Sequence, residues 1–345
     1  MVANMRKGIL AAGTVAMATV LGLGAATAAE KITLRLHHFN SPVGGAHVKF
    51  MQPWSERINA KAGDRMEIKV YPAMQLGGKS RDLYNQARDG FVDMIWTVPG
   101  YTANRFPKTE VFSLPFVSGN AEQTSQAYYE FAGMHLMDEY SDTVPVMFHV
   151  SPSTGIYSTK PIVKLDDLKG LKLRAPGRGA GAGFKAIGAN VIGMPMPQVP
   201  EALQRGVIDA VFTSWAVNKT FKLFEATSHN VELSGVSTTP FILTANKASW
   251  EKLPAEMQKI IREESTIELA AQLGRIWDAD DVAGRENAEK TSKTFEPKGA
   301  ELEQWKNIMQ PVIDEWIAEM KGKGVDGAKL VADAKALVAK YSKTN

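Results

Sequence analysis

Residues 89–96 read Asp-Gly-Phe-Val-Asp-Met-Ile-Trp, and residues 205–212 read Arg-Gly-Val-Ile-Asp-Ala-Val-Phe. In both stretches a helix-like segment ends at a glycine, and the chain turns directly into an apolar run that carries an aspartate near its start. Glycine is common just past a helix end, and a short apolar run bounded in this way is typical of a buried strand. The two stretches therefore predict two α/β units of similar construction.

The segments around these stretches continue the alternation of strands and helices. Residues 32–38 alternate in polarity as a strand does, residues 41–45 break the pattern, and a helical spacing of apolar residues starts at His47. Further strands are predicted at residues 66–71, 143–150, 170–173, 207–212 and 241–246. Strands separated by helix-length segments favour an α/β fold with mixed, mostly parallel sheets.

The similar construction of the two units predicts a chain of two lobes. We place lobe 1 at residues 30–150, with later segments returning to it at roughly 240–280, and lobe 2 at residues 151–239. Residues 252–291 are rich in Glu, Ala, Leu, Ile and Gln, so we expect a long helix that bridges the lobes. Residues 281–345 are expected to form C-terminal helices that pack on the lobes.

The first 29 residues differ in character from the rest of the chain. Arg6 and Lys7 precede an apolar run from Ile9 to Leu23, and Ala26-Thr27-Ala28 follows. This order predicts a secretory signal peptide over residues 1–29, because the run is shorter than the roughly 20 residues of a transmembrane helix and ends in an A-x-A cleavage motif. We therefore expect export to the periplasm, which also suits a chain with 0 cysteines.

Composition and motifs argue against several classes of function. The 40 basic and 37 acidic residues give a formal charge of +3 without long runs of one sign, so we expect no binding to nucleic acid. No serine-hydrolase elbow, P-loop or paired-carboxylate motif stands out, so we expect no enzyme activity. The 6 histidines show no H-x-x-x-H spacing and cysteine is absent, so we expect no metal and no other cofactor.

Residues 177–183 read Gly-Arg-Gly-Ala-Gly-Ala-Gly and formally satisfy the G-x-G-x-x-A dinucleotide pattern. However, residues 174–176 separate these glycines from the preceding strand, and no acidic residue ends a strand about 20 residues later. We interpret the segment as a flexible glycine-rich loop. A dinucleotide-dependent oxidoreductase is kept as the less favoured alternative.

Arg174 follows a predicted buried strand and is the most informative charged residue. An isolated guanidinium in such a place would cost several kcal/mol, so it requires a partner. On residue type alone two partners are open, namely an aspartate or glutamate of the same chain and the carboxylate of a ligand.

The stretch from Leu168 to Pro176 resembles the signature of the solute-binding subunits of TRAP transporters, the DctP-type family. Further landmarks follow in the order usual for the family. They are Tyr71-Pro72, Gln75-Leu76-Gly77-Gly78, Asp89-Gly90, Val92-Asp93, Phe112-Ser113-Leu114-Pro115-Phe116, Glu201-Ala202-Leu203-Gln204 and Leu253-Pro254-Ala255-Glu256-Met257-Gln258. The chain is therefore identified as a member of this family.

The resemblance implies a two-lobed periplasmic binding protein that closes around a small organic acid and delivers it to the membrane subunits of an ion-gradient-driven TRAP permease. It also implies that Arg174 pairs with the ligand carboxylate, for which the two parallel N–H donors of arginine are suited. A second arginine and an asparagine of the sialic-acid-binding branch align with Thr154 and Thr213, which disfavours a sugar acid. The residues of a metal-assisted branch are not recognisable at 212–215. We expect a monomer.

The ends of the predicted strands supply the other candidates for the ligand site, because ligands of open α/β sheets lie at the carboxyl ends of strands. His37 or His38 ends the first strand, and the sequence leaves open which of them faces the site. The predicted ligand-binding residues are Arg174, Trp215, Tyr101, His38, Thr97, Val98, Trp96, His149, Met196, Thr213, Ser214 and Asn218. Aromatic rings and a thioether dominate this set, so the implied ligand is a carboxylate with an aromatic or apolar body.

Two further alternatives stay open at this point. The ligand could be a non-aromatic monocarboxylate, such as a 2-oxo or hydroxy acid. The protein could instead be the ligand-sensing module of a signalling system, which we disfavour because no signalling segment is recognised.

Overall fold

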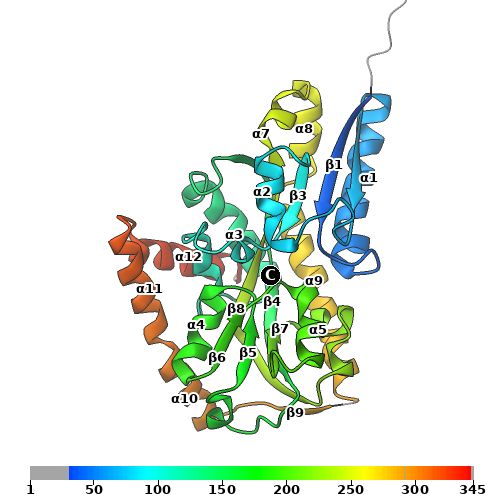
Figure 1. The fold of residues 1–345 in the computed structure, drawn as a ribbon. Helices are drawn as coiled ribbons and strands as arrows, with labels where there is room; N and C mark the ends of the chain where they lie inside the picture. Colours follow the sequence, from blue (N-terminus) through cyan, green and yellow to red (C-terminus); the bar gives the residue numbers. More distant parts are fainter. Residues whose placement is uncertain (1–30, 291, 343–345) are drawn as a thin grey trace, which may run out of the picture. The chain divides into compact units, whose positions relative to one another are not determined.

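The computed structural model describes residues 31–290 and 292–342, so the predicted signal peptide lies outside the described residues. In this part of the chain one sheet has the strand order β2-β1-β3-β8-β4-β7-β5-β6, and β9 pairs with β8 (Figure 1). The strands are β1 (Ile32–His38), β2 (Met66–Tyr71), β3 (Met94–Thr97), β4 (Thr143–Ser158), β5 (Lys172–Ala175), β6 (Asn190–Gly193), β7 (Ala210–Thr213), β8 (His229–Asn246) and β9 (Lys293–Phe295).

The sheet is mixed and has two parallel halves. Strand β1 pairs in parallel with β2 and β3, and these three strands form what we call the β1 half. Strand β5 pairs in parallel with β6 and β7, and these form the β5 half. The pairs β3–β8, β8–β4 and β4–β7 are antiparallel and join the halves. The predicted mixed, mostly parallel α/β fold is therefore confirmed.

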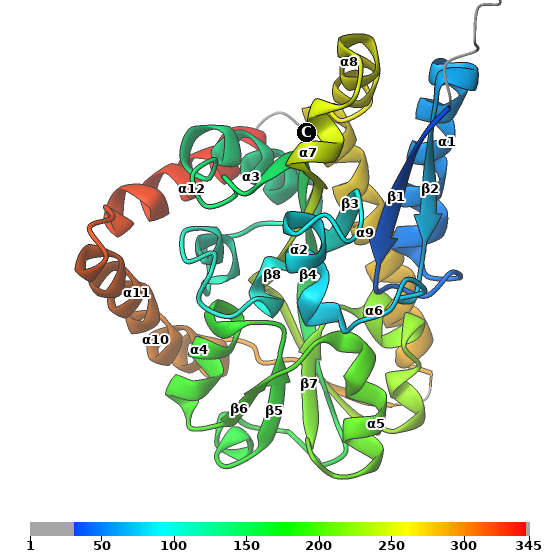
Figure 2. The same ribbon diagram turned by 45° about the horizontal axis from the view of Figure 1, so that its top comes forward.

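Helices surround this sheet, and α10, α11 and α12 follow one another along the side that carries α3 and α4 (Figure 2). The helices are α1 (Gln52–Ala62), α2 (Leu83–Arg88), α3 (Ala121–His135), α4 (Arg178–Ile187), α5 (Val199–Gln204), α6 (Trp215–Thr220), α7 (Lys247–Glu251), α8 (Ala255–Glu263), α9 (Ile267–Ala288), α10 (Ala300–Met309), α11 (Pro311–Gly322) and α12 (Gly327–Ser342). None of the helices in the described residues is both long and apolar enough to span a bilayer.

The strands β4 and β8 are much longer than the sequence analysis predicted. Strand β4 continues through residues 151–158, and β8 begins at His229, 12 residues before the predicted start at 241. Residues 151–155 read Ser-Pro-Ser-Thr-Gly and resemble a turn, but they pair with β8 across a register shift between Ser153 and Gly155. Most of both strands is buried, so the alternation of polarity that marks a half-exposed strand is absent.

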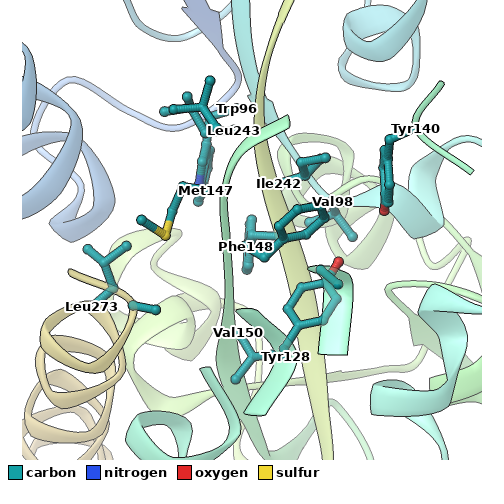
Figure 3. Close-up of a cluster of buried hydrophobic side chains, with 14 of the residues drawn as sticks. Trp96, Val98, Tyr128, Tyr140, Met147, Phe148, Val150, Ile242, Leu243 and Leu273 are labelled. Carbon is teal, nitrogen blue, oxygen red and sulfur yellow. The ribbon is translucent and has the colours of Figure 1, made fainter. Parts of the chain in front are cut away.

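The apolar core forms separate clusters on the two halves of the sheet. The larger cluster packs Trp96, Phe148 and Tyr128 together with Leu273 of α9 (Figure 3). A second cluster lies in the β5 half and includes Phe184, Phe212 and Trp305. Helices α11 and α12 contribute to the larger cluster, and α10 contributes to the second. The residue boundaries of the two lobes stay a prediction.

The glycine-rich segment 177–183 is not the flexible loop that we predicted, because it forms the first turns of α4. A Cβ atom on Gly181 would lie 2.7 Å from Val191 Cγ1 and 3.3 Å from Ala175 Cβ, and one on Gly183 would lie 3.1 Å from Met309. The glycines therefore let α4 pack closely on β5, β6 and α10.

The long helix α9 has 22 residues and confirms the predicted long helix. It packs on α3 and β4 and also on α6, which follows strand β7 of the β5 half. Glycines permit both of its close approaches. A Cβ on Gly274 would lie 2.3 Å from Glu122 Cα, and one on Gly284 would lie 2.5 Å from the Trp215 carbonyl oxygen.

We predict that Gly274→Ala lowers stability by about 1–3 kcal/mol, because the added methyl group meets the backbone of α3. The matched control is Gly133→Ala in α3, where no heavy atom lies within 4 Å of the added Cβ. This control should gain roughly 0.5–1 kcal/mol from helix propensity. Urea unfolding measures both free energies, and equal shifts in the two variants would contradict the close packing of α9.

Candidate ligand-binding site

Arg174 lies in β5 and is almost fully buried, with 1% of its surface exposed. Its Nε donates to the Met194 carbonyl oxygen at 2.8 Å, and Nη1 donates to the Phe212 carbonyl oxygen at 3.3 Å. Nη2 makes no hydrogen bond of good geometry within the described residues, and no aspartate or glutamate among them pairs with the group, although the Tyr101 hydroxyl lies beside it. Burial lowers the pKa of the guanidinium, which nevertheless stays charged in proteins. Of the two partners left open by the sequence, an internal carboxylate is not observed.

Arg174 lines a small cavity to which both halves of the sheet, the β4–β8 pair and α9 contribute. Six predicted residues line it, namely Trp96, Val98, Tyr101, Arg174, Met196 and Thr213. The other lining residues were not predicted from the sequence, namely Phe39, Asn40, Ser151, Pro176, Val217, Phe221, Thr239, Phe241 and Trp277. The cavity thus combines one cation and a few hydroxyl and amide groups with a large aromatic surface.

Four aromatic rings on the walls of this cavity form one stack, in which each ring faces the next. Trp96 stacks on Phe241 with centroids 4.4 Å apart and an angle of 10° between the planes. Phe39 lies 5.2 Å from Trp96 at 26°, and Trp277 lies 6.0 Å from Phe241 at 17°. Rings stacked in this way cover one another's faces, and together they give the cavity an apolar aromatic wall.

Tyr101 joins the two halves of the sheet across the cavity. It ends the short helical turn Pro99–Tyr101 that follows β3, and its hydroxyl accepts a hydrogen bond from the Met196 backbone N–H at 3.1 Å. Beside it, a Cβ on Gly100 would lie only 3.3 Å from Gly177 Cα, so the two backbones touch. Burial raises the pKa of Tyr101, so the hydroxyl keeps its proton and can donate it into the cavity.

Two predicted histidines support the aromatic wall from behind and do not line the cavity. His38 Nδ1 accepts the Asn40 backbone N–H at 3.1 Å, so its proton lies on Nε2 and is donated to His47 Nδ1 at 3.1 Å. His149 Nε2 accepts the indole N–H of Trp96 at 2.9 Å. Burial lowers the pKa of both His38 and His149 to about 3, so both rings are neutral near pH 7.

Neither His37 nor His38, the two histidines at the end of β1, lines the cavity. The His37 ring pairs with Gln86 Oε1 at 2.8 Å and accepts the Leu76 backbone N–H at 3.3 Å. Burial lowers the pKa of His37 as well. In the described parts of the chain, no group of three or more His, Asp or Glu side chains could hold a metal ion.

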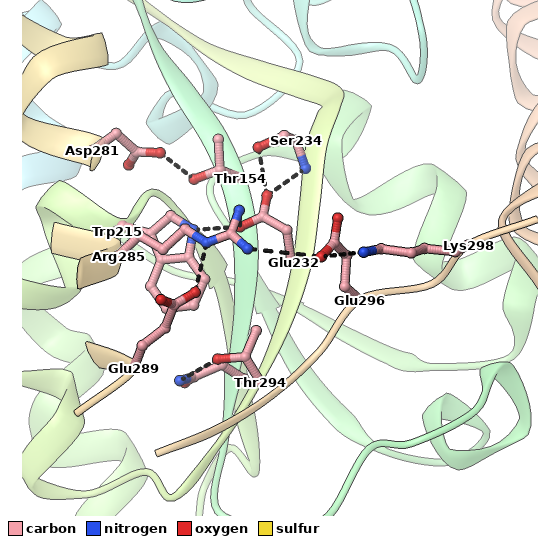
Figure 4. Close-up of polar contacts among 11 residues, drawn as sticks. Thr154, Trp215, Glu232, Ser234, Asp281, Arg285, Glu289, Thr294, Glu296 and Lys298 are labelled. Atoms are coloured by element: carbon pink, nitrogen blue, oxygen red, sulfur yellow. Dashed lines mark hydrogen bonds and ion pairs between the residues drawn. The ribbon is translucent and has the colours of Figure 1, made fainter. Parts of the chain in front are cut away.

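Trp215, predicted as a ligand contact, is not among the lining residues of the cavity and lies beside Glu232 and Arg285 (Figure 4). Its indole N–H donates to Glu232 Oε2 at 2.8 Å, and its ring meets Tyr157 edge-on at 4.9 Å. The same carboxylate pairs with Arg285 of α9 at 3.2 Å. Trp215 therefore anchors α6 to β8 and α9.

The geometry of α6 explains why Val217 and Phe221 line the cavity and Trp215 does not. Ser214 caps α6 by accepting the Val217 N–H at 3.1 Å, and the helix then directs Val217 and Phe221 to the cavity at a spacing of four residues. Asn218 lies on another face of α6 and is buried. Thr97 alternates with its neighbours in β3 and points to the opposite side of the sheet. Ser214, Asn218 and Thr97 are thus not among the lining residues.

A larger groove of about 800 Å³ adjoins the cavity and shares Val98, Tyr101, Pro176 and Thr239 with it. Its walls come mainly from α4, α11 and residues 99–114. In this groove Arg178 pairs with Glu110 at 2.7 Å and with Glu319, and Arg81, Lys185 and Glu315 also line it. The guanidinium of Arg174 lies in the smaller cavity, which has a volume of about 30 Å³ in this conformation and is the candidate ligand site.

A buried aspartate fixes α6, and with it part of the cavity wall, to the long helix. Asp281 of α9 accepts the Thr154 hydroxyl at 2.7 Å and the Ala216 backbone N–H at 3.1 Å (Figure 4). Burial outweighs these hydrogen bonds and raises the pKa of Asp281 to about 6. The carboxylate therefore contributes to the pH dependence of stability.

A cavity that is built around an unpaired cation and closed by contacts between two halves of a sheet defines a solute-binding protein. The chain belongs to the DctP family, described as bacterial extracellular solute-binding protein, family 7, whose profile matches residues 38–319. This confirms the family that was identified from the sequence. Proteins of this family bind solutes for TRAP transport outside the cytoplasm, and the chain is a TRAP solute-binding protein and not an enzyme.

Solved structures of TRAP solute-binding proteins resemble the chain over nearly its full length. One from Rhodoferax ferrireducens T118, in complex with copurified benzoate, is 38% identical, with 91% of this chain and 99% of that chain covered and a TM-score of 0.86. A marine metagenome protein specific for aromatic acids, with 3-hydroxybenzoate bound, is 36% identical with 90% and 99% covered and a TM-score of 0.87. A Bordetella bronchiseptica protein with bound mandelate is 26% identical, with 90% and 99% covered and a TM-score of 0.83.

We predict that Asp281→Asn removes a pH-dependent part of the stability. A carboxyl whose pKa is raised in the folded state stabilises the protein at low pH, and this contribution is lost as pH rises through about 6. Relative to the variant, the wild-type protein should therefore lose about 2 kcal/mol between pH 4.5 and pH 7. Urea unfolding at several pH values gives this difference, and parallel pH profiles of the two proteins would contradict it.

Proposed function

We propose that this protein binds a small aromatic carboxylate in the cavity at Arg174 and delivers it to the membrane subunits of a TRAP permease. The observation that carries the proposal is the unpartnered Nη2 of a fully buried guanidinium in an aromatic cavity. A buried charge of this kind needs a partner, and a ligand carboxylate supplies one with two-pronged geometry.

Other polar groups of the cavity are suited to the same carboxylate. The Tyr101 hydroxyl accepts one hydrogen bond from Met196 and retains a proton that it can donate. Thr213 lies at the end of β7, next to β5, and its hydroxyl bonds to no described atom. Two neutral donors beside one arginine would stabilise a single carboxylate and would leave a second carboxylate without a partner.

The aromatic body of the ligand is supported by the cavity walls. The rings of Phe39, Trp96, Phe241 and Trp277 give the cavity an apolar aromatic wall, whereas a sugar acid or short hydroxy acid would require more polar partners. The benzoate and 3-hydroxybenzoate complexes of relatives that are more than 35% identical over 90% of this chain agree with this chemistry. A non-aromatic 2-oxo or hydroxy acid is therefore the weaker candidate.

We further propose that the protein works as a monomer in the periplasm and that its halves separate to admit the ligand. The contacts of Tyr101 with Met196 and of Gly100 with Gly177 close the small cavity in the present conformation, so a ligand requires their opening. Delivery to a permease is supported by membership of the solute-binding family, and the proposed closure around the ligand would let the permease distinguish loaded protein.

We predict that Arg174→Ala weakens benzoate binding by about 2–5 kcal/mol, or roughly 30-fold to several thousand-fold, because it removes one partner of a buried ion pair. Arg174→Lys should also bind poorly, since an ammonium group lacks the parallel donors. Titration calorimetry on dialysed, ligand-free protein gives the dissociation constants, and benzamide serves as the uncharged comparison ligand.

The control for this experiment is Arg205→Ala, which removes an arginine whose side chain is 72% exposed and pairs only within α5 and its end. It should leave benzoate affinity unchanged. Unchanged affinity in a folded Arg174→Ala protein would end the carboxylate-binding role of this residue.

The predicted signal peptide gives a separate test of export. Protein recovered from a periplasmic extract should lack residues 1–28 or 1–29, because the cleavage motif ends at Ala28. Intact mass spectrometry distinguishes this from the full-length chain, whose presence in the periplasm would contradict the prediction.

A further inference from the structure

We infer that Asn40 is a specificity-determining residue that donates its side-chain N–H to a hydrogen-bond acceptor on the ligand ring. The site would therefore select ring-hydroxylated aromatic carboxylates over unsubstituted ones. This inference rests on the proposed function, and it concerns the wall of the cavity that faces away from the carboxylate. Asn40 follows β1 and lines the cavity from the β1 half, whereas Arg174 lines it from the β5 half.

The backbone of Asn40 is held on both sides by hydrogen bonds. Its N–H donates to His38 Nδ1 at 3.1 Å, and its carbonyl oxygen accepts the Ala73 N–H at 2.9 Å. The neutral state of His38 preserves the first of these contacts. The residue is 5% exposed, so it is built into the wall of the cavity rather than placed on a surface loop.

The orientation of the Asn40 amide is also determined. Its Oδ1 accepts the Ser41 backbone N–H at 2.9 Å, which identifies this atom as oxygen because an N–H cannot donate to an NH₂ group. The amide nitrogen Nδ2 donates no hydrogen bond to a described residue, and it is not among the fully enclosed polar atoms that lack a partner. A polar donor at the wall of a closed apolar cavity favours a ligand that provides an acceptor.

Gly44 makes room for this amide. A Cβ on Gly44 would lie 2.6 Å from Asn40 Oδ1 and 3.1 Å from Asn40 Cγ. The turn that positions Gly44 is closed by its own N–H, which donates to the Ser41 carbonyl oxygen at 3.0 Å. The segment 41–45, which the sequence marks only as a break after the first strand, thus has a definite role in holding Asn40.

A hydroxyl oxygen on the ring of the ligand is the acceptor that best fits the chemistry of this site. A second carboxylate is disfavoured because Asn40 offers a neutral amide and the cavity provides no second cation among its lining residues. An unsubstituted ring would leave Nδ2 without a partner once the cavity has closed. The hydroxyl should therefore improve affinity by about 10-fold.

The test compares benzoate, 3-hydroxybenzoate and 4-hydroxybenzoate by titration calorimetry against wild-type protein and Asn40→Leu, which keeps the side-chain volume and removes the donor. Wild-type protein should bind at least one hydroxybenzoate about 10-fold more tightly than benzoate. Asn40→Leu should lose this preference, so its affinities for benzoate and for the hydroxybenzoates should differ by less than those of the wild-type protein. The position of the preferred hydroxyl on the ring reports where Nδ2 lies relative to Arg174.

A second variant tests the same role without altering Asn40. Gly44→Ala displaces the amide and should also reduce the preference for the hydroxyl, whereas Gly133→Ala, remote from the site, should not. Equal affinities of wild-type protein for all three ligands would overturn the inference, as would an equal loss for all three in Asn40→Leu. The proposed function itself fails only if no aromatic carboxylate binds wild-type protein, a result that is distinct from both.

Discussion

The antiparallel pairing of β4 with β8 is the interaction on which the rest of the molecule depends. The two strands pair from Thr143 and Asn246 at one end to Ser158 and His229 at the other. Strand β3 attaches the β1 half near one end of this pair, and β7 attaches the β5 half near the other. The floor of the cavity, with Ser151, Thr239 and Phe241, comes from the stretch between these attachments. The candidate ligand site is therefore a consequence of two parallel half-sheets that share one long antiparallel pair.

The parts of the site that the sequence could predict are those that lie at strand ends. Trp96 and Val98 at the end of β3, Arg174 in β5 and Thr213 at the end of β7 all line the cavity. The rule that ligands lie at the carboxyl ends of parallel strands requires only the order of apolar runs along the chain. Arg174 could be recognised from the sequence because a charged residue in a buried strand needs a partner whatever the tertiary structure.

The other residues of the site could not be predicted because their positions depend on tertiary contacts that no local sequence pattern shows. Phe241 and Trp277 reach the cavity because a long buried strand and a long helix pass beside it, and neither residue ends an element. Trp215 looked like a ligand contact because it follows β7, but the cap at Ser214 starts a helix that turns the indole toward Glu232. The glycines of α4 were predicted to form a loop because the sequence does not show that Val191 and Met309 lie too close to them to leave room for side chains.

The buried charges of the protein differ in one respect that bears on transport. Glu232 is paired with Arg285 and Trp215, and Asp281 accepts two hydrogen bonds, so both carboxylates are satisfied without a ligand. Arg174 alone among these three retains an unsatisfied donor while the cavity is closed. An unpaired buried donor disfavours the conformation that buries it, by about 1–3 kcal/mol and by more for a charged group. If the cavity binds a carboxylate as proposed, closure without the ligand is opposed and the bound carboxylate removes this cost, so a permease that recognises the closed form would meet mainly loaded protein.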